Sequence, residues 1–386
     1  MKTKLKTTSA VKDRYAAGAK AQEPALCCPV DYDPLFLKVI PDVVIERDYG
    51  CGDPSKYVRP GETVLDLGSG TGKICFIASQ VVGAEGSVIG VDMTDDMLQI
   101  ARENAPIVAD KIGYANVEFR KGRIQDLALD LDVFEKRLAA EPVANANAYL
   151  AAEDAAEEMR LSEPMIADES IDVVVSNCVL NLVSVAERKK LFSEVFRVLK
   201  VGGRAVISDI VCDEDVPLEM QEDAELWSGC ISGAFREDDF LQAFEDAGFY
   251  GVQILKLDKE PWRTVKGIEF RSMTIEATKG SDDTCLERHQ AVIYKGPFKS
   301  ITDDDGHTMV RGRRYAVCDR TYRTYKSGPF ADAFEFIDPR VEVPMSDAEV
   351  YDCSVTALRP AAVTKGAVYD ATTEASDCCE PSGGCC

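Results

Sequence analysis

The sequence lacks several features that would assign it to common classes of protein. Its 386 residues carry a formal net charge of −23, so there is no basic excess to displace counterions from phosphates. We therefore expect no nucleic acid and no membrane as partner. It has no run of about 18 apolar residues, and residues 1–20 carry lysines without the apolar core of a signal peptide. These absences predict a soluble, cytoplasmic protein.

The chain has fourteen cysteines but no C-x2-C pair, so the spacing of a zinc ribbon or finger is missing. In a reducing compartment, cysteines are more typical of metal binding, redox chemistry or catalysis than of a disulfide framework. Cys51, Cys178 and Cys230 stand singly in the body of the chain. The adjacent pairs near the termini are Cys27-Cys28, Cys378-Cys379 and Cys385-Cys386. Histidine is scarce, and we assign no catalytic role to His289 or His307.

Strand and helix patterns alternate from Thr63 onward, which is typical of an α/β fold with a doubly wound parallel sheet. The predicted strands are 63–67, 88–91, 117–120, 171–175, 205–208 and 252–255, and the predicted helices are 95–105, 186–199 and 237–247. The alanine-rich, acidic stretch 138–163 has no strand pattern. We predict that it is a surface insertion that is helical in part.

The chain is predicted to contain four parts. They are an irregular, partly helical N-terminal segment (1–60) that carries the Cys51 loop, the α/β domain (61–260), a smaller C-terminal β-rich (α+β) domain (261–365) and a disordered cysteine-rich tail (366–386). The β-rich assignment rests on strand-like runs at 268–277 and 289–294. The acidic run 302–307 lacks the closing glutamate of a calcium loop, which favours a solvated hairpin turn.

A glycine loop follows the first predicted strand. Gly68, Gly70 and Gly72 form G-x-G-x-G, whereas dinucleotide-binding loops have G-x-G-x-x-G. A phosphate loop is also disfavoured, because Ile74 stands where its hydroxyl residue would be. The glycines would let the backbone approach a ligand closely. Asp92 lies about 20 residues further on, at the end of the second strand, where a carboxylate can hold ribose hydroxyls.

The segment Asp66–Gly72 resembles the first motif of S-adenosylmethionine-dependent methyltransferases with a Rossmann-like core. This resemblance implies a class I methyltransferase sheet and S-adenosyl-L-methionine as methyl donor. It also implies that Asp92 binds the ribose, that Met93 lies on the adenine and that Asn177 is near the sulfonium. The full set of implied cofactor contacts is Tyr49, Gly50, Asp66, Gly68, Ser69, Gly70, Thr71, Gly72, Asp92, Met93, Ile124, Gln125 and Asn177.

The three single cysteines are candidates for substrate binding. Cys178 follows the strand 171–175, at the strand end where α/β sheets bind ligands. Cys230 lies in a loop that would reach the same rim, and Cys51 stands between glycines that allow close approach. Each alone could be a buried filler. Together they suit a thiophilic centre such as trivalent arsenic, whose lone pair can attack an electrophilic methyl group.

The segments 49–52, 176–182 and 230–234 resemble the three cysteine motifs of arsenite methyltransferases, over about residues 30–300. The resemblance implies methylation of arsenite, or of its thiol conjugates, as a detoxification reaction. Arsenic(III) would be bound by Cys178 and Cys230, with Cys51 as third thiolate or as redox partner of Cys178. Thioredoxin or glutathione would be the reductant, and the protein would be a monomer. The terminal cysteine pairs would pass arsenic inward or be reactive tail thiols.

Two other functions compete with this interpretation. The first is methyl transfer to a small organic substrate, in which case the cysteines are packing residues. The second is a metal-buffering protein that binds no cofactor and takes up zinc or cadmium stoichiometrically. The glycine loop, followed by Asp92 at a ribose-binding distance, argues against the second.

Overall fold

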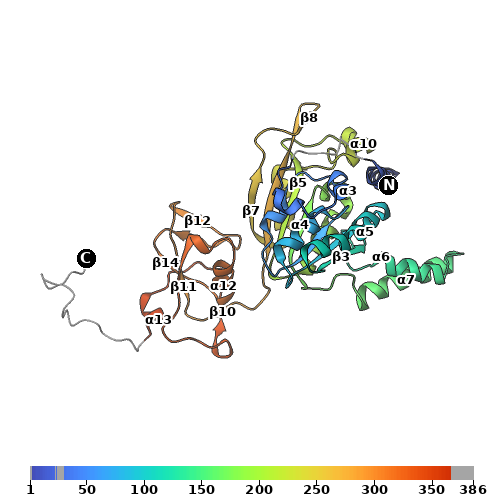
Figure 1. Ribbon diagram of the computed structural model, residues 1–386. Helices are drawn as coiled ribbons and strands as arrows, with labels where there is room; N and C mark the ends of the chain where they lie inside the picture. The colour runs from blue at the N-terminus through green and yellow to red at the C-terminus, as the bar shows by residue number, and fades with distance from the viewer. Residues whose placement is uncertain (1, 22, 24–29, 367–386) are drawn as a thin grey trace. The chain divides into compact units, whose positions relative to one another are not determined.

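The computed structural model describes residues 2–21, 23 and 30–366, and its contacts divide the chain into two compact units (Figure 1). Unit 1 extends to Gly280 and unit 2 begins at Ser281. The predicted boundary near residue 260 is therefore too early. The run 268–277 belongs to the main sheet of unit 1, because it pairs along its length with a central strand. The predicted tail and the terminal cysteine pairs lie outside the described residues, except for Gly366.

Unit 1 is built on a sheet with the strand order β3-β2-β1-β4-β5-β9-β7. These strands are β1 (Thr63–Leu67), β2 (Ser87–Asp92), β3 (Val117–Lys121), β4 (Ile171–Asn177), β5 (Leu199–Cys212), β7 (Phe249–Leu257) and β9 (Ile268–Lys279). Strands β1 to β5 are parallel, and β9 runs antiparallel to both of its neighbours. The short strands β6 (Phe235–Arg236) and β8 (Arg263–Val265) pair at the margin. The predicted doubly wound sheet is confirmed.

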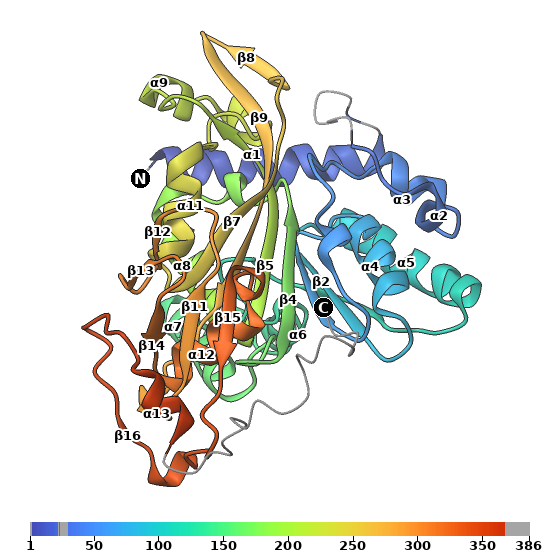
Figure 2. The same cartoon turned by 90° about the vertical axis from the view of Figure 1, so that its left-hand side faces the viewer.

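Helices cover both faces of this sheet (Figure 2). Val64 and Leu65 are consecutive in β1 and point to opposite faces, as alternation along a strand requires. Val64 packs in the core that contains α4 (Lys73–Val82) and α5 (Asp95–Ile112). Leu65 packs in the core that contains α8 (Val185–Val198) and α11 (Glu237–Glu245). Burial on both faces explains why these strands read as nearly continuous apolar runs.

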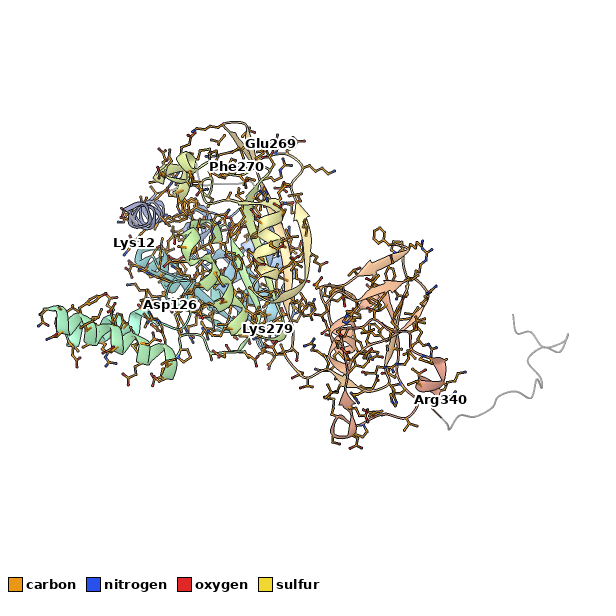
Figure 3. The ribbon with its side chains drawn as sticks, turned by 180° about the vertical axis from the view of Figure 1, so that it is seen from behind. Lys12, Asp126, Glu269, Phe270, Lys279 and Arg340 are labelled. Atoms are coloured by element: carbon orange, nitrogen blue, oxygen red, sulfur yellow. The ribbon has the colours of Figure 1, made fainter. Side chains whose placement is uncertain are left out.

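Strand β9 is the part of the main sheet that the sequence analysis assigned to the wrong domain. Figure 3 labels Glu269 and Phe270 near one end of β9 and Lys279 at the other. Lys279 Nζ donates to the Leu199 carbonyl at 2.8 Å, where β5 begins. This contact joins residues 80 positions apart, so no local sequence pattern predicts it.

The N-terminal segment is more regular than predicted, because α1 (Lys2–Lys20) is one continuous helix. Arg14 of α1 donates to the Glu225 carbonyl at 3.0 Å and to Ser228 Oγ at 3.1 Å, which fixes the helix against α10 (Ala224–Ser228). The remaining helices of unit 1 are α2 (Pro34–Leu37), α3 (Asp42–Glu46), α6 (Leu131–Ala140), α7 (Ala146–Ser162) and α9 (Leu218–Gln221). Stretch 138–163 thus consists mainly of α7.

Unit 2 has its own core, in which Val292, Tyr322 and Phe334 are buried. Its small sheets pair β14-β11-β15, β10-β16 and β12-β13. The elements are β10 (Leu286–Glu287), β11 (Ala291–Tyr294), β12 (Ser300–Thr302), β13 (Thr308–Val310), β14 (Arg314–Ala316), α12 (Asp319–Ser327), β15 (Phe334–Ile337), β16 (Glu349–Val350) and α13 (Ala361–Lys365). The acidic run 302–307 is a hairpin turn, as predicted. Within the described ranges, no helix has the length and apolarity needed to cross a bilayer.

Candidate active site

The glycine loop connects β1 to α4 and needs glycine at several positions. Gly68, Gly70 and Gly72 have φ values of 71°, 53° and 91°, in the region that side chains disfavour. A Cβ on Gly68 would lie 2.5 Å from Val179 Cγ1. A Cβ on Gly70 would meet nothing within 4 Å, so the loop backbone is open to the space in front of it. The loop can therefore present its backbone directly to a ligand.

Asp92 stands at the end of β2, opposite this loop. Its Oδ2 accepts a hydrogen bond from the Gly70 amide at 3.0 Å, and its Oδ1 accepts one from the Thr94 amide at 2.8 Å. Burial raises the pKa of this carboxyl, although these backbone donors oppose the shift. The hydroxyl of Ser69 is buried beside it and has no hydrogen-bond partner among the described residues. A polar ligand in front of the loop would satisfy that hydroxyl.

A pocket that opens to solvent lies in front of the loop. Its lining includes the predicted cofactor residues Tyr49, Asp66, Gly68, Ser69, Gly70, Asp92, Met93, Ile124, Gln125 and Asn177. Gly50, Thr71 and Gly72 do not line it. Thr71 is fully buried and donates to the Val44 carbonyl at 2.9 Å, while Gly72 is the N-cap residue that precedes α4. These two residues shape the loop from behind.

The pocket is acidic at the end of β1. Asp66 is buried, and its Oδ2 accepts a hydrogen bond from Cys75 Sγ at 3.1 Å. Burial raises the pKa of Asp66 to about 7; the nearby Asp48 and Asp92 add to this effect, and the Cys75 bond opposes it. The carboxyl is therefore poised to change its charge near neutral pH.

The three predicted cysteines come together beside this pocket. Cys51, Cys178 and Cys230 belong to one buried cluster, and Cys178 also lines the pocket. Cys230 Sγ donates to the Cys178 carbonyl at 3.4 Å, although the two residues are 52 positions apart. The sulfurs of Cys51 and Cys178 and a carboxylate oxygen of Asp209 lie within 4.8 Å of one another. Residues from three segments thus form one thiol group at the strand ends.

Two of these cysteines have an unusual backbone conformation. Cys178 has a φ of 64° and Cys230 a φ of 61°, in the left-handed region that residues other than glycine rarely adopt. The Cys178 amide donates to the Ser208 carbonyl at 2.8 Å, which holds this turn at the end of β4. Such conformations persist where the surroundings enforce them, and they are concentrated at functional sites.

Asn177 connects the Cys51 loop to the sheet. Its Oδ1 accepts hydrogen bonds from the amides of Cys51 and Gly52, at 2.9 and 3.0 Å. Its Nδ2 donates to the Gly52 carbonyl at 2.8 Å and to the Tyr32 hydroxyl at 3.2 Å. A Cβ on Gly50 would overlap the Asn177 side chain. Gly50 and Asn177 therefore place Cys51 beside Cys178.

Comparison with known proteins finds relatives that align with most of this chain. An arsenite methyltransferase from Aquipseudomonas alcaligenes is 33% identical over 329 residues, which cover 81% of this chain and 84% of that protein. The chain belongs to the arsenite methyltransferase family. The human arsenite methyltransferase is 28% identical over 91% of this chain and 86% of its own length. The one from Halobacterium salinarum is 38% identical, over 61% of this chain and 51% of its own.

Structure and family models agree with this assignment. The crystal structure of an arsenic(III) S-adenosylmethionine methyltransferase from Chlamydomonas reinhardtii is 26% identical, with a TM-score of 0.55, and the match covers 86% of this chain and 99% of that one. A model described as a methyltransferase domain matches residues 59–160 and 145–248. A domain of unknown function matches residues 281–369. This arsenite methyltransferase family member thus has the expected class I fold, with a further β-rich unit, and it is an S-adenosylmethionine-dependent enzyme.

Two residues of this family member's site were not predicted from the sequence. Asp209 is fully buried in β5, and burial raises its pKa to about 6. Hydrogen bonds from the amides of Ile210 and Asn181 act in the opposite direction and lower the pKa. Tyr15 of α1 lies with its hydroxyl 4.0 Å from Cys230 Sγ. Burial, followed by the nearby Cys230 and Cys178, raises the pKa of Tyr15. Asp209 could have been found from the sequence, because it is a charged residue inside the apolar run 205–212. Nothing in the sequence near Tyr15 indicates that it lies beside the thiols.

Proposed function

We propose that this protein transfers a methyl group from S-adenosylmethionine to trivalent arsenic held by Cys178 and Cys230, as a detoxification reaction. The observation that carries the proposal is the position of the thiol group. Cys178 lines the same pocket as the glycine loop and contacts Cys230 through its carbonyl. A thiophilic substrate bound there would lie beside a cofactor bound at the loop.

The pocket fits the cofactor in its chemistry. The open backbone at Gly70, the unsatisfied hydroxyl of Ser69 and the fixed carboxylate of Asp92 offer polar partners for a nucleoside. Asp66 offers a carboxylate to a cationic amino group. When bound, S-adenosylmethionine supplies a methyl group that is already activated by the sulfonium. The protein's own task is then to align the acceptor with that methyl group.

Arsenous acid can exchange its hydroxyl groups for thiols without any change in oxidation state. Each As–O bond that breaks is replaced by an As–S bond, and the thiol proton leaves with the hydroxide as water. The thiols of Cys178 and Cys230 are buried, so exchange there also excludes solvent from the arsenic. The carboxylate of Asp209 is close enough to Cys51 and Cys178 to accept a proton during this exchange.

Cys51 is proposed to complete the cycle. Attack by the arsenic lone pair on the methyl group leaves the arsenic oxidised by two electrons. The thiol of Cys51 can return those two electrons by attacking the arsenic-bound sulfur of Cys178. The bond between arsenic and Cys178 then breaks and leaves its electron pair on the arsenic, a Cys51–Cys178 disulfide forms, and the proton of Cys51 is released. Their sulfur atoms lie within 4.8 Å of each other, so only a small movement is needed. Thioredoxin or glutathione would then reduce the disulfide.

The first test is transfer of labelled methyl from S-adenosylmethionine to arsenite in the presence of glutathione. We expect soluble or volatile methylarsenicals with the parent protein, and a loss of at least about 10²-fold in rate with Cys178→Ser. The reason is that serine keeps the size of the side chain but is a poor ligand for a thiophilic centre.

Cys212→Ser is the matched control for this test. Cys212 is buried in the same cluster but does not line the pocket, and its Sγ bonds to the Phe235 carbonyl at 3.3 Å, which a serine hydroxyl can also do. This variant should keep its activity. Absence of transfer by a folded, cofactor-binding parent would refute the proposal and favour an organic substrate.

A further inference from the structure

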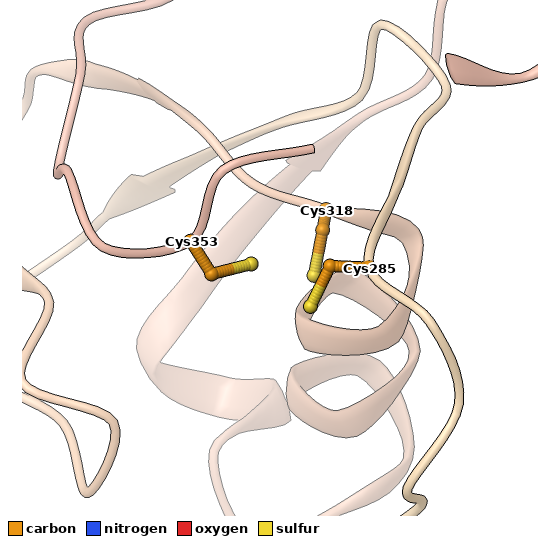
Figure 4. Close-up of side chains that lie close together, drawn as sticks. All are labelled: Cys285, Cys318 and Cys353. Atoms are coloured by element: carbon orange, nitrogen blue, oxygen red, sulfur yellow. The ribbon is translucent and has the colours of Figure 1, made fainter. Parts of the chain in front are cut away.

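Unit 2 contains a second group of thiols. The sulfurs of Cys285, Cys318 and Cys353 lie within 4.8 Å of one another, and Figure 4 shows them gathered from three separate segments of the chain. None of the three forms a disulfide. They lie more than 30 positions apart in the sequence, so their convergence is a product of the fold. All three are within the domain of unknown function.

Each cysteine is held in place by a hydrogen bond of its own. The Cys285 carbonyl accepts the Tyr351 amide at 2.8 Å, next to the pairing of β10 with β16. Cys318 caps the N-terminus of α12, where its Sγ accepts the Thr321 amide at 3.3 Å. The Cys353 carbonyl accepts a hydrogen bond from His307 Nε2 at 3.0 Å. The backbone at Cys285 and Cys353 and the thiol of Cys318 are therefore held by the fold, which lowers the entropic cost of bringing the three thiols onto a common ligand.

The composition of the group restricts what it can bind. Sulfur ligands exclude hard cations such as magnesium and calcium. Structural zinc sites are closed by four ligands, whereas this group contains no fourth cysteine, histidine or carboxylate among the described residues. Three thiolates around a divalent ion would also leave a net negative charge in a partly buried place, which is costly. A trivalent centre that takes three ligands leaves the site neutral.

We propose that Cys285, Cys318 and Cys353 form a second binding site for trivalent arsenic. Arsenous acid would lose its three hydroxyl groups as water, taking up the three thiol protons, and three As–S bonds would replace the three As–O bonds. No electron is transferred. The choice of arsenic rests on the proposed function of unit 1, whereas the choice of a three-coordinate thiophilic centre rests on unit 2 alone.

The test counts arsenic on the full-length chain, reduced and with the three terminal cysteine pairs changed to serine. Equilibrium dialysis against arsenite, with arsenic measured by mass spectrometry, should give two atoms per chain. The double variant Cys318→Ser/Cys353→Ser, which leaves one thiol in the unit 2 group, should lower this to one, and the double variant Cys178→Ser/Cys230→Ser should independently lower it to one. Combining the two double variants should abolish binding, and Cys212→Ser should leave two.

These variants separate the two proposals. If only the change at Cys178 and Cys230 removes arsenic, unit 2 binds none and the second site is refuted. If only Cys318→Ser/Cys353→Ser removes arsenic, the second site stands and the proposed substrate site fails. Alkylation mapping on the parent protein guards against misfolding of the unit 2 variant, because arsenite should protect Cys285, Cys318 and Cys353 from iodoacetamide.

Competing metals provide the last arm of the test. Zinc or cadmium ions should displace arsenic from unit 2 only when present in large excess. Zinc binding would also release protons from the thiols, whereas arsenous acid binding releases water and no net protons. Proton release at equimolar zinc, with protection of Cys285 and Cys353 at lower concentrations of zinc than of arsenite, would overturn the assignment of arsenic.

Discussion

Single side chains of the active site owe their properties to burial. Asp66 and Asp209 have almost no access to water and Asp92 is half-buried, and burial raises the pKa of all three carboxyl groups. For Asp66 the pKa reaches about 7, because Asp48 and Asp92 add their negative charges to the effect of burial. A cationic cofactor has the opposite effect, since it favours the ionised carboxylate. Cofactor binding and proton release at Asp66 should therefore be linked.

We expect the affinity for S-adenosylmethionine to fall by up to tenfold per pH unit below about pH 7, because Asp66 is then protonated. Asp66→Asn should bind the cofactor more weakly at pH 8 and should lose this pH dependence. Isothermal titration calorimetry between pH 5.5 and 8.5 measures the affinity at pH 8 and its dependence on pH. Asp42→Asn, at an exposed position outside the pocket, is the control. An unchanged pH slope in Asp66→Asn would show that another group is responsible.

The carboxyl of Asp66 also makes the stability of the folded protein depend on pH. The folded protein holds the Asp66 proton more tightly than the unfolded chain, so between about pH 4 and pH 7 the folded state carries more protons. The contribution of Asp66 to stability is therefore present at low pH and is lost as the pH rises through about 7. Denaturant unfolding without cofactor measures this effect. Between about pH 4 and pH 7, the free energy of unfolding should decline less steeply with rising pH in Asp66→Asn than in the parent protein.

The candidate residues chosen from local patterns in the sequence mostly lie together in the structure. The glycine loop with Asp92 and the glycine-flanked Cys51 are contiguous patterns, and most of the predicted cofactor residues do line one pocket. Asp209 and Tyr15 were missed because their contacts with the thiols arise only when β5 and α1 pack beside them. The cysteines of unit 2 were missed because no recognisable spacing connects them.

At the level of elements, the Cys51 loop depends on one side chain from β4. Asn177 makes four hydrogen bonds to residues 32, 51 and 52. The loop has little regular structure of its own, so its position is set by this tertiary contact. The proposed redox role of Cys51 therefore depends on Asn177.

Asn177→Ala should release the loop and slow repeated turnover by about 10²-fold, the size of effect expected when a reacting group is misplaced. Asn177→Asp keeps the acceptor for the amides of Cys51 and Gly52 but loses the donor, so its defect should be smaller. Hydrogen exchange at those amides should rise in the same order. Full turnover with rapid loop exchange in Asn177→Ala would contradict the role of Cys51.

Element boundaries show where sequence reasoning fails. The parallel strands β1 to β4 were predicted within a few residues, since β1, β2 and β4 are nearly continuous apolar runs and β3 alternates apolar with charged residues. Strand β5 begins at Leu199, within the predicted helix 186–199, and ends at Cys212, so it is longer at both ends than the predicted strand 205–208. Strand β9 was placed in the wrong domain because its pairing with β5 is antiparallel and distant in sequence.

On the scale of the whole chain, the two units have separate hydrophobic cores. Residues of unit 1 form the cores around the main sheet, and residues of unit 2 form a smaller one around β11 and α12. A ligand that binds only one unit stabilises the amides that open together with that unit.

We therefore expect S-adenosylhomocysteine to protect the two units unequally from hydrogen exchange. At a concentration of about 100 times its Kd, it should raise the opening free energy of the slowest amides of unit 1 by up to about 2.7 kcal/mol. Amides of β11 and β15 in unit 2 should be unaffected. Equal protection in both units would mean that they unfold as one cooperative body.

The left-handed backbone at Cys178 and Cys230 has a consequence for how this sequence can change. Glycine adopts such a conformation at no steric cost, whereas another residue loses roughly 1–2 kcal/mol. Replacement by glycine would relieve this backbone cost but would also remove a buried side chain from the cluster that contains Ile210 and Phe270. The two effects oppose each other, so the melting temperatures of Cys178→Gly and Cys230→Gly would measure how much backbone strain the protein stores at each of these positions.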